Sequence, residues 1–168
     1  RMPFKSYLIF LSLWSLLVYV PSAHWIWGGG FLQQMCAADF AGGIAIHTSA
    51  GVAALVTVLV LGKRSMQKAE EAKPGSLTLF AIGTAILWFG WFGFNGGSAL
   101  AANGKAAIAF VNTALAGGVT MVTWLAISWN HTKHPSFAEA LTGAVAGFVA
   151  ITPAAGYVSP WAAVLIGL

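Results

Sequence analysis

The amino-acid sequence predicts an all-α fold, a polytopic bundle of helices that spans a membrane. Of the 168 residues, 58% are hydrophobic and only 7% are charged, whereas about 25% of the residues of an average soluble domain are charged. The mean hydropathy is +0.80, and glycine and aromatic residues, both frequent in membrane helices, are abundant. Eight Lys/Arg and four Asp/Glu cannot give a chain of this length a polar surface. Water is therefore not its main solvent.

Six apolar runs lie between polar segments, and each is a candidate for one crossing of the bilayer. A hydrocarbon core about 30 Å thick requires about 20 apolar residues in a helix. The last two runs are short and adjoin at Thr152 and Pro153. We predict one membrane domain over residues 1–168, with no separate soluble domain, and we expect it to be part of a longer protein. The runs cover residues 7–25, 40–61, 77–94, 106–129, 137–151 and 155–168.

The basic residues predict the orientation of this bundle. Cytoplasmic loops of membrane proteins are enriched in Lys and Arg. With a cytoplasmic N-terminus, seven of the eight basic residues fall inside and only Lys105 falls outside, so the loops around residues 24–30 and 95–105 share the outer face. The net charge of +4 is spread too thinly for a nucleic-acid surface, and the single Cys36 leaves the redox compartment open. The seven inner residues are Arg1, Lys5, Lys63, Arg64, Lys68, Lys73 and Lys133.

Two ionisable residues, Asp39 and His47, lie in the second run or at its start. Ionisable residues are costly inside a membrane, so each is a candidate functional residue. Eight positions apart on a helix, they differ by about 80° around the axis and about 12 Å along it, so both can line one broad face. A neutral imidazole suits a neutral polar solute or a structural bond between helices. A carboxylate at a helix start is also an N-cap, which favours a role for Asp39 in shaping the site.

Aromatic residues gather at the predicted outer face. Trp91, Phe94 and Ser98 have the spacing i, i+3 and i+7, which places them on one face of a helix that reaches residue 98. Trp27 lies on the same side, beside three glycines. An aromatic belt at the membrane interface explains any one of these tryptophans. A tryptophan face with a hydroxyl oxygen is also a suitable receptor for a small cation, whereas the absence of arginine from the spans disfavours an anion carrier.

Small residues in two runs predict close helix contacts, within the chain or between subunits. They are Gly117 and Gly118 in the fourth run, and Gly143 and Gly147, spaced as GxxxG, in the fifth. The sequence contains no Gly-rich phosphate loop, no metal-ligand cluster and no Ser/His/Asp constellation. It therefore predicts no catalytic residue, no cofactor and no metal, and a protein that is not an enzyme.

Taken together, these segments resemble the ammonium transporter family of the Amt and Mep type, with the Rh proteins as distant relatives. Residues 39–51, DFAGGIAIHTSAG, are similar to the signature that opens the family's fifth transmembrane helix. The one departure is Ala45, where a β-branched residue is more usual. The resemblance covers essentially the whole chain, because four further segments match in order: residues 23–30 (AHWIWGGG), 88–98 (WFGWFGFNGGS), 109–113 (AFVNT) and 152–157 (TPAAGY).

The resemblance implies a fold of eleven transmembrane helices built as two inverted repeats, of which this chain supplies about helices four to nine. It implies that Trp27 and Ser98 belong to an external ammonium-recruitment site, and that Asp39 supports this site. By the same resemblance, Phe94 forms part of a stacked-phenylalanine gate and Trp91 flanks the pore. The implied setting is the cell membrane, with a homotrimer in the lipid bilayer and a cytoplasmic PII-type regulator as partners.

The resemblance also implies a mechanism, in which NH4+ is recruited and loses its proton, and NH3 crosses along His47, the first of two pore histidines, with the proton following or staying behind. The second histidine and the other gate phenylalanine fall outside the chain. Two alternatives remain, an ammonium sensor or non-conducting scaffold, and an Rh-type gas channel. Trp27 and Ser98 favour the Amt side over the Rh side.

Overall fold

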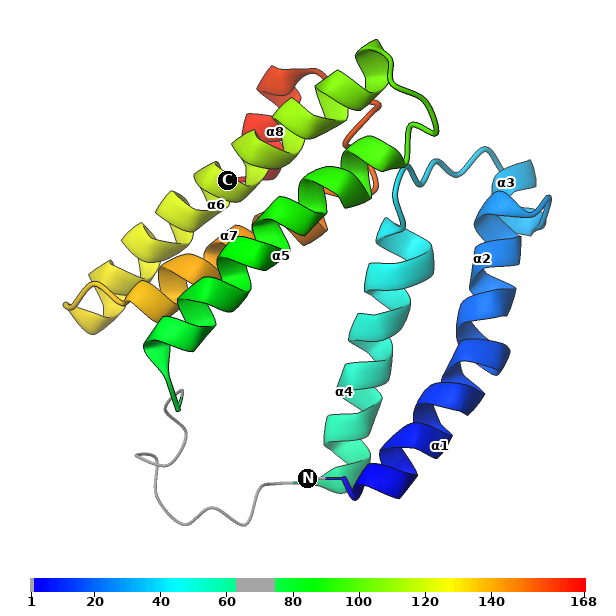
Figure 1. Cartoon of the computed structure of the whole chain (residues 1–168), viewed down its shortest axis with the longest axis horizontal. Helices are drawn as coiled ribbons and strands as arrows, with labels where there is room; N and C mark the ends of the chain where they lie inside the picture. The colour runs from blue at the N-terminus through cyan, green and yellow to red at the C-terminus, as the bar shows by residue number, and fades with distance from the viewer. Residues whose placement is uncertain (1, 63–74) are drawn as a thin grey trace. The chain divides into compact units, whose positions relative to one another are not determined.

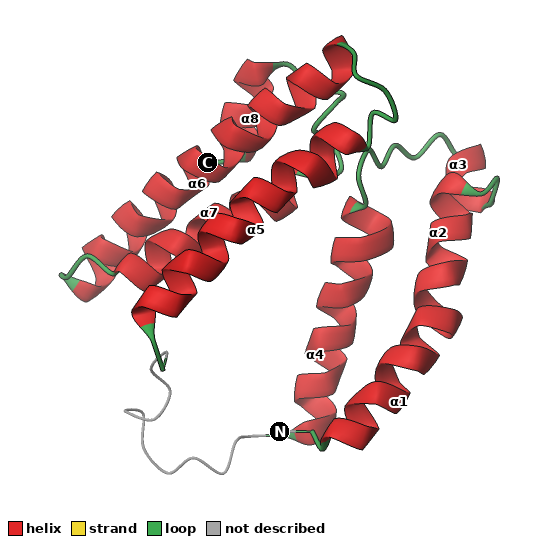
Figure 2. Ribbon diagram, in the orientation of Figure 1, coloured by secondary structure: helices red, strands yellow, loops and turns green. Residues whose placement is uncertain are grey.

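In the computed structural model, residues 2–62 and 75–168 are described, and every regular element in these ranges is a helix (Figure 2). The chain forms two compact units, residues 1–73 and residues 74–168. Among the described helices, four are long and apolar enough to cross a membrane. The predicted all-α membrane fold is therefore confirmed. These four are Phe4–Gln34, Gly43–Leu61, Leu77–Gly97 and Gly104–Thr132.

The first unit begins with one long helix that continues through a proline. It is made of α1 (Phe4–Trp14), the π-helix η1 (Ser15–Tyr19) and α2 (Val20–Trp27), and the short α3 (Phe31–Gln34) follows (Figure 1). Pro21 has no N–H and would interrupt a regular α-helix. In the wider turn before it, the N–H of Val20 bonds to the carbonyl of Ser15, five residues back. This turn lets the helix pass the proline with a local change of winding.

The second helix of this unit is made of the π-helix η2 (Gly43–Thr48) and α4 (Ser49–Leu61). It begins at Gly43, three residues later than the predicted run, because Gly42 has a φ of 110°. A side chain at Gly42 would also lie only 2.5 Å from the side chain of Ile46, so glycine is required there. The predicted inner residues Arg1, Lys63, Arg64, Lys68 and Lys73 lie outside the described residues.

The second unit contains α5 (Leu77–Gly97), α6 (Gly104–Thr132), α7 (Phe137–Ile151) and α8 (Pro160–Ile166), with α7 running along α6 in Figure 1. Each begins at a polar residue whose side chain accepts the N–H of the residue three positions on, which satisfies one of the free amides of the first turn. α5 continues three residues beyond the predicted run. The four capping residues are Ser76, Asn103, Ser136 and Ser159.

The last two predicted runs form shorter helices than a bilayer crossing requires. α7 has the predicted bounds but only 15 residues, which give a length of about 22 Å against a hydrocarbon core of about 30 Å. The sequence predicts that the last run begins near residue 155, whereas residues 152–158 form turns and α8 covers only seven residues. The start of α8 is explained by Pro160, because proline favours the first position of a helix.

The GxxxG pair of α7 packs against α6, within the chain. A side chain at Gly143 would lie 2.9 Å from the carbonyl oxygen of Thr120, and one at Gly147 would lie 2.5 Å from that of Ala116. Only hydrogen at these two positions allows the backbones of α6 and α7 to approach so closely. The predicted close contact is confirmed here, and its partner is α6.

The two adjacent glycines of α6 differ in the space around them. A side chain at Gly117 would overlap the ring of Phe148 in α7, whereas one at Gly118 would meet nothing within 4 Å. Phe148 is fully buried. The prediction of a close contact is therefore confirmed for Gly117, while the structure of this unit gives Gly118 no such contact.

Candidate functional site

Asp39 caps the helix that carries His47. Its Oδ1 accepts the backbone N–H groups of Gly42 and Gly43 at 2.9 and 2.6 Å, and its Oδ2 accepts those of Ile44 and Ala45 at 2.8 and 3.1 Å. The side chain is 5% exposed. One carboxylate thus satisfies four free amides and places its negative charge at the positive end of the helix dipole. The capping role considered from the sequence is present, with the bonds starting at Gly42.

Trp27 is fixed by the backbone of the same aspartate. The indole Nε1 donates to the carbonyl oxygen of Asp39 at 2.8 Å, and 42% of the tryptophan is exposed. The turn after it is tight, since a side chain at Gly28 would lie 2.6 Å from Nδ1 of His24 and one at Gly30 would lie 2.5 Å from Cα of Trp25. Two contacts of Asp39 therefore join the end of α2 to the start of η2.

His47 lies in η2, one turn after the cap, and is half-buried. Its backbone N–H bonds to the carbonyl of Gly42 at 2.9 Å, five residues back, and the hydroxyl of Thr48 donates to the carbonyl of Gly43 at 2.8 Å. The backbone bond defines a widened helical turn, a form that is rare and is found frequently at functional sites. Asp39 precedes this helix, which begins at Gly43, so the facing estimated from a regular helix does not hold between Asp39 and His47.

The C-terminal end of α5 carries the three predicted aromatic and hydroxyl positions. The helix reaches Gly97 and Ser98 caps it with right-handed helical dihedrals, so Trp91, Phe94 and Ser98 share one helix face, as predicted. The hydroxyl of Ser98 donates to the carbonyl oxygen of Phe94 at 2.7 Å. With its proton engaged in this bond, the Ser98 oxygen is left to act as an acceptor.

Trp91 is held by a segment that lies 61 residues further along the chain. Its Nε1 donates to Oγ1 of Thr152 at 3.0 Å, and Oγ1 of Thr152 donates to the carbonyl oxygen of Phe148 at 2.7 Å. The Trp91 ring centroid lies 5.4 Å from that of Phe148 and 5.7 Å from that of Phe94. Sequence reasoning did not single out Thr152 as an anchor of Trp91. A threonine before a proline at the end of an apolar run is commonplace and carries no periodic signal.

Two buried asparagines connect the helices of the second unit. Nδ2 of Asn95 donates to Oγ1 of Thr113 at 2.9 Å, and Nδ2 of Asn112 donates to the carbonyl oxygens of Ala155 and Val158, each at 2.8 Å. Both asparagines are fully buried. They connect α5 with α6, and α6 with the turn at residues 152–158, which is the turn that supplies Thr152.

The six predicted site residues are divided between the two units. Trp27 and Asp39 are in direct contact in the first unit, which also holds His47. Trp91 and Phe94 are in direct contact in the second, which also holds Ser98. The predicted recruitment pair, Trp27 and Ser98, has one member in each unit and stays a prediction.

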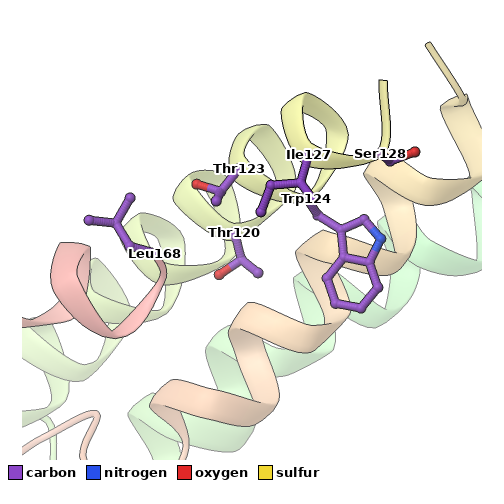
Figure 3. Close-up of a pocket in the computed structure, with 6 residues that line it drawn as sticks. All are labelled: Thr120, Thr123, Trp124, Ile127, Ser128 and Leu168. Carbon is purple, nitrogen blue, oxygen red and sulfur yellow. The ribbon is translucent and has the colours of Figure 1, made fainter. Parts of the chain in front are cut away.

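Two of the cavities within the described residues are apolar, and neither is lined by any of the six residues. One, in the first unit, has a volume of about 610 Å³ and lies between the helix of α1, η1 and α2 and the helix of η2 and α4. The other, in the second unit, has a volume of about 390 Å³ and lies along α6, with the indole of Trp124 at one side (Figure 3). The residues lining the second are Thr120, Thr123, Trp124, Ile127, Ser128 and Leu168.

Comparison with known proteins extends over the whole chain. Residues 1–168 match the Ammonium Transporter Family. The chain is 49% identical over 168 residues to an ammonium transporter of Bacillus subtilis, a match that covers 100% of this chain and 41% of that protein. Thus the chain spans about two fifths of the length of this curated relative.

Solved structures give the same result. The crystal structure of Candida albicans Mep2 is similar with a TM-score of 0.91 and 42% sequence identity, covering 98% of this chain and 37% of that one. A Sensor Amt Protein is similar with a TM-score of 0.91 and 30% identity, covering 100% of this chain and 44% of that one. The family match, the identity to a curated relative and the shared fold agree: the chain belongs to the ammonium transporter family.

Proposed function

We propose that the protein containing this chain transports ammonium across the cell membrane, by recruiting NH4+ at an outer aromatic site and conducting NH3 through an apolar pore. The observation that carries the proposal is the family match, which extends over all 168 residues. The substrate follows from the Bacillus subtilis relative, which is an ammonium transporter. The roles of individual residues are those that the family resemblance implies, and the contacts of each residue support them.

Trp27 and Ser98 suit the recruitment of a small cation that carries N–H donors. The Trp27 ring is partly exposed and its N–H is already bonded to Asp39, so a fixed aromatic face is available to the cation. The Ser98 oxygen can accept one N–H bond, because its own proton is donated to Phe94. The Asp39 carboxylate is committed to four backbone amides, so Asp39 supports the site by holding Trp27.

Deprotonation before or at the gate follows from the cost of desolvation. A small cation loses far more solvation free energy in an apolar passage than neutral NH3 does. In the proposed path, the proton leaves before or at Phe94, and NH3 crosses the apolar pore along His47, with Trp91 flanking the pore. The imidazole can donate to NH3 or accept from it. K+ can occupy the cation–π site but has no proton to lose, which gives selectivity.

The complete pore requires the remainder of the protein, with a second histidine and a second gate phenylalanine. We also propose that both units belong to one membrane domain, that three copies form a homotrimer, and that a PII-type regulator binds at the cytoplasmic face. These partners follow from the family resemblance and are tested on the full-length protein by native mass spectrometry with and without the regulator.

A substitution of the pore histidine in the full-length transporter tests the central step. We expect His47→Ala to reduce ammonium uptake or to admit K+, because the polar contact inside the apolar pore is lost. The matched control is His131→Ala, which removes an exposed imidazole at the end of α6. Uptake and K+ selectivity that both stay unchanged in His47→Ala would contradict the pore role.

An ammonium sensor is the second candidate, favoured by the similarity to a Sensor Amt Protein. Purified full-length protein in liposomes separates the two functions. A transporter gives a flux that depends on the ammonium gradient, whereas a sensor binds ammonium without flux. A flux at low ammonium that is indifferent to Trp27→Ala would instead favour the Rh-type gas channel.

A further inference from the structure

Both the N–H group and the ring of Trp91 are held by neighbouring residues. Its N–H donates to Oγ1 of Thr152 at 3.0 Å, and its ring lies 5.4 Å from the ring of the fully buried Phe148, which also contacts Trp88 at 4.9 Å. Phe148 is seated in the space that Gly117 leaves by having no side chain. The indole therefore rests on a part of the molecule that close packing makes rigid.

Thr152 occupies the junction of these contacts. It is fully buried and follows the last residue of α7. Its hydroxyl has one proton, which is donated to the carbonyl of Phe148 at 2.7 Å, so its oxygen faces the indole as an acceptor. This direction is fixed, because the indole N–H can only donate. A hydroxyl at this position can thus accept from the indole N–H and donate to the carbonyl of Phe148 at the same time.

We propose that Thr152 is a positioning residue of the gate: its hydroxyl fixes the indole of Trp91, and Trp91 in turn fixes the ring of Phe94, 5.7 Å away. This inference rests on the proposed function, in which Phe94 forms the constriction. A ring that is held by its neighbour keeps the constriction narrow, and a ring free to change rotamer admits larger amines. Thr152 thereby sets both the rate and the size selectivity of conduction without touching the solute.

The substitution Thr152→Val in the full-length transporter removes the hydroxyl and keeps the shape of the side chain. We expect the maximal ammonium uptake rate to fall about fivefold, the effect of one neutral hydrogen bond, with little change in KM. The ratio of methylammonium to ammonium uptake rises. Thr152→Ser keeps the hydroxyl and is expected to retain the wild-type rate within about twofold. Should Thr152→Val not reach the membrane, Thr152→Cys replaces it, because a thiol is a weak acceptor.

Thr152→Val also removes the hydrogen bond from Thr152 to the carbonyl of Phe148, which affects the fold and not the indole of Trp91. Two controls separate this effect from the loss of the bond to Trp91. Thr142→Val removes the same kind of bond within α7, since the exposed Thr142 hydroxyl donates to the carbonyl of Ala138 at 2.9 Å. The second control introduces Thr152→Val into Trp91→Phe, which has no indole N–H. We expect Thr152→Val to have no further effect on rate or selectivity in that background.

The outcomes separate this inference from the proposed function. An equal loss of rate from Thr152→Val with and without Trp91→Phe would show that the threonine acts on the fold alone and would overturn the inference. The inference also fails if Trp91→Phe changes selectivity while Thr152→Val does not. If Trp91→Phe itself leaves uptake and selectivity unchanged, the pore role of Trp91 in the proposed function fails first.

Discussion

At the scale of single residues, Asp39 makes two kinds of contact, one through its side chain and one through its backbone. Its carboxylate caps four amides, and its backbone carbonyl holds the indole of Trp27. The sequence predicts that Asp39 is a cap, and the family resemblance implies that it supports the site. The number of amides it would satisfy depends on the path of the chain through Gly42, whose positive φ no periodicity reveals.

The cap gives a prediction about stability. In Asp39→Asn, one carboxylate oxygen becomes an NH2 group that faces two backbone donors, and the charge at the helix start is lost. We expect a loss of about 2 kcal/mol in the free energy of unfolding, measured by denaturant titration of the full-length protein in detergent. Glu139→Gln, which also removes one carboxylate, is the control and should change stability by less than about 0.5 kcal/mol. Equal effects of the two substitutions would contradict the capping role.

The contact of the indole N–H gives a prediction about binding. Trp27→Phe keeps an aromatic ring but loses the bond to the carbonyl of Asp39, so the ring is no longer fixed. We expect KM for ammonium to rise about fivefold with a maximal rate close to wild type, because only recruitment weakens. Trp25→Phe is the matched control, a tryptophan of similar exposure that contacts Phe31. A KM that changes equally in both variants would remove Trp27 from the recruitment site.

At the scale of elements, most helix positions follow from the apolar runs, and the exceptions have local physical causes. The π-helix at Ser15–Tyr19 accompanies Pro21, and the late start of α8 accompanies Pro160. Neither proline changes the hydropathy pattern from which the spans are predicted, so neither feature is visible in that pattern. The contact of Trp91 with Thr152 is also not predictable from the sequence, since it joins segments 61 residues apart whose meeting depends on how α5, α6 and α7 pack together.

The packing of α6 gives a prediction with its control in the adjacent residue. Gly117→Ala places a methyl group into the ring of Phe148, whereas Gly118→Ala meets nothing within 4 Å. Overpacking of a filled core costs about 1 to 3 kcal/mol, and alanine at an unhindered helix position stabilises by up to about 1 kcal/mol. We expect the midpoint of thermal unfolding to fall in Gly117→Ala and to hold or rise in Gly118→Ala. The same direction of change in both variants would contradict the packing of Phe148 against Gly117.

At the scale of the whole molecule, the sparse charge that predicts a membrane protein also predicts which way it faces. Of the residues used for that prediction, Lys5, Lys105 and Lys133 are described, and several others are not. The four membrane-length helices agree with the first four predicted runs. The sequence motifs identify the family over the whole chain, but the structure does not bring the predicted pore residues together. The reasons are that these residues are divided between two units and that the chain covers only part of the length of its relatives.

The orientation gives a prediction that one cysteine can test. Cys36 is exposed and lies between Trp27 and Asp39 in sequence, on the predicted outer side, whereas His134 lies in the loop that Lys133 assigns to the cytoplasm. In the full-length protein with any further cysteines removed, we expect a membrane-impermeant maleimide to label Cys36 in intact cells. With Cys36→Ser and His134→Cys combined, labelling should require permeabilised cells. Labelling with the opposite pattern would invert the topology and place Trp27 on the cytoplasmic side, where recruitment of external ammonium by its ring is impossible.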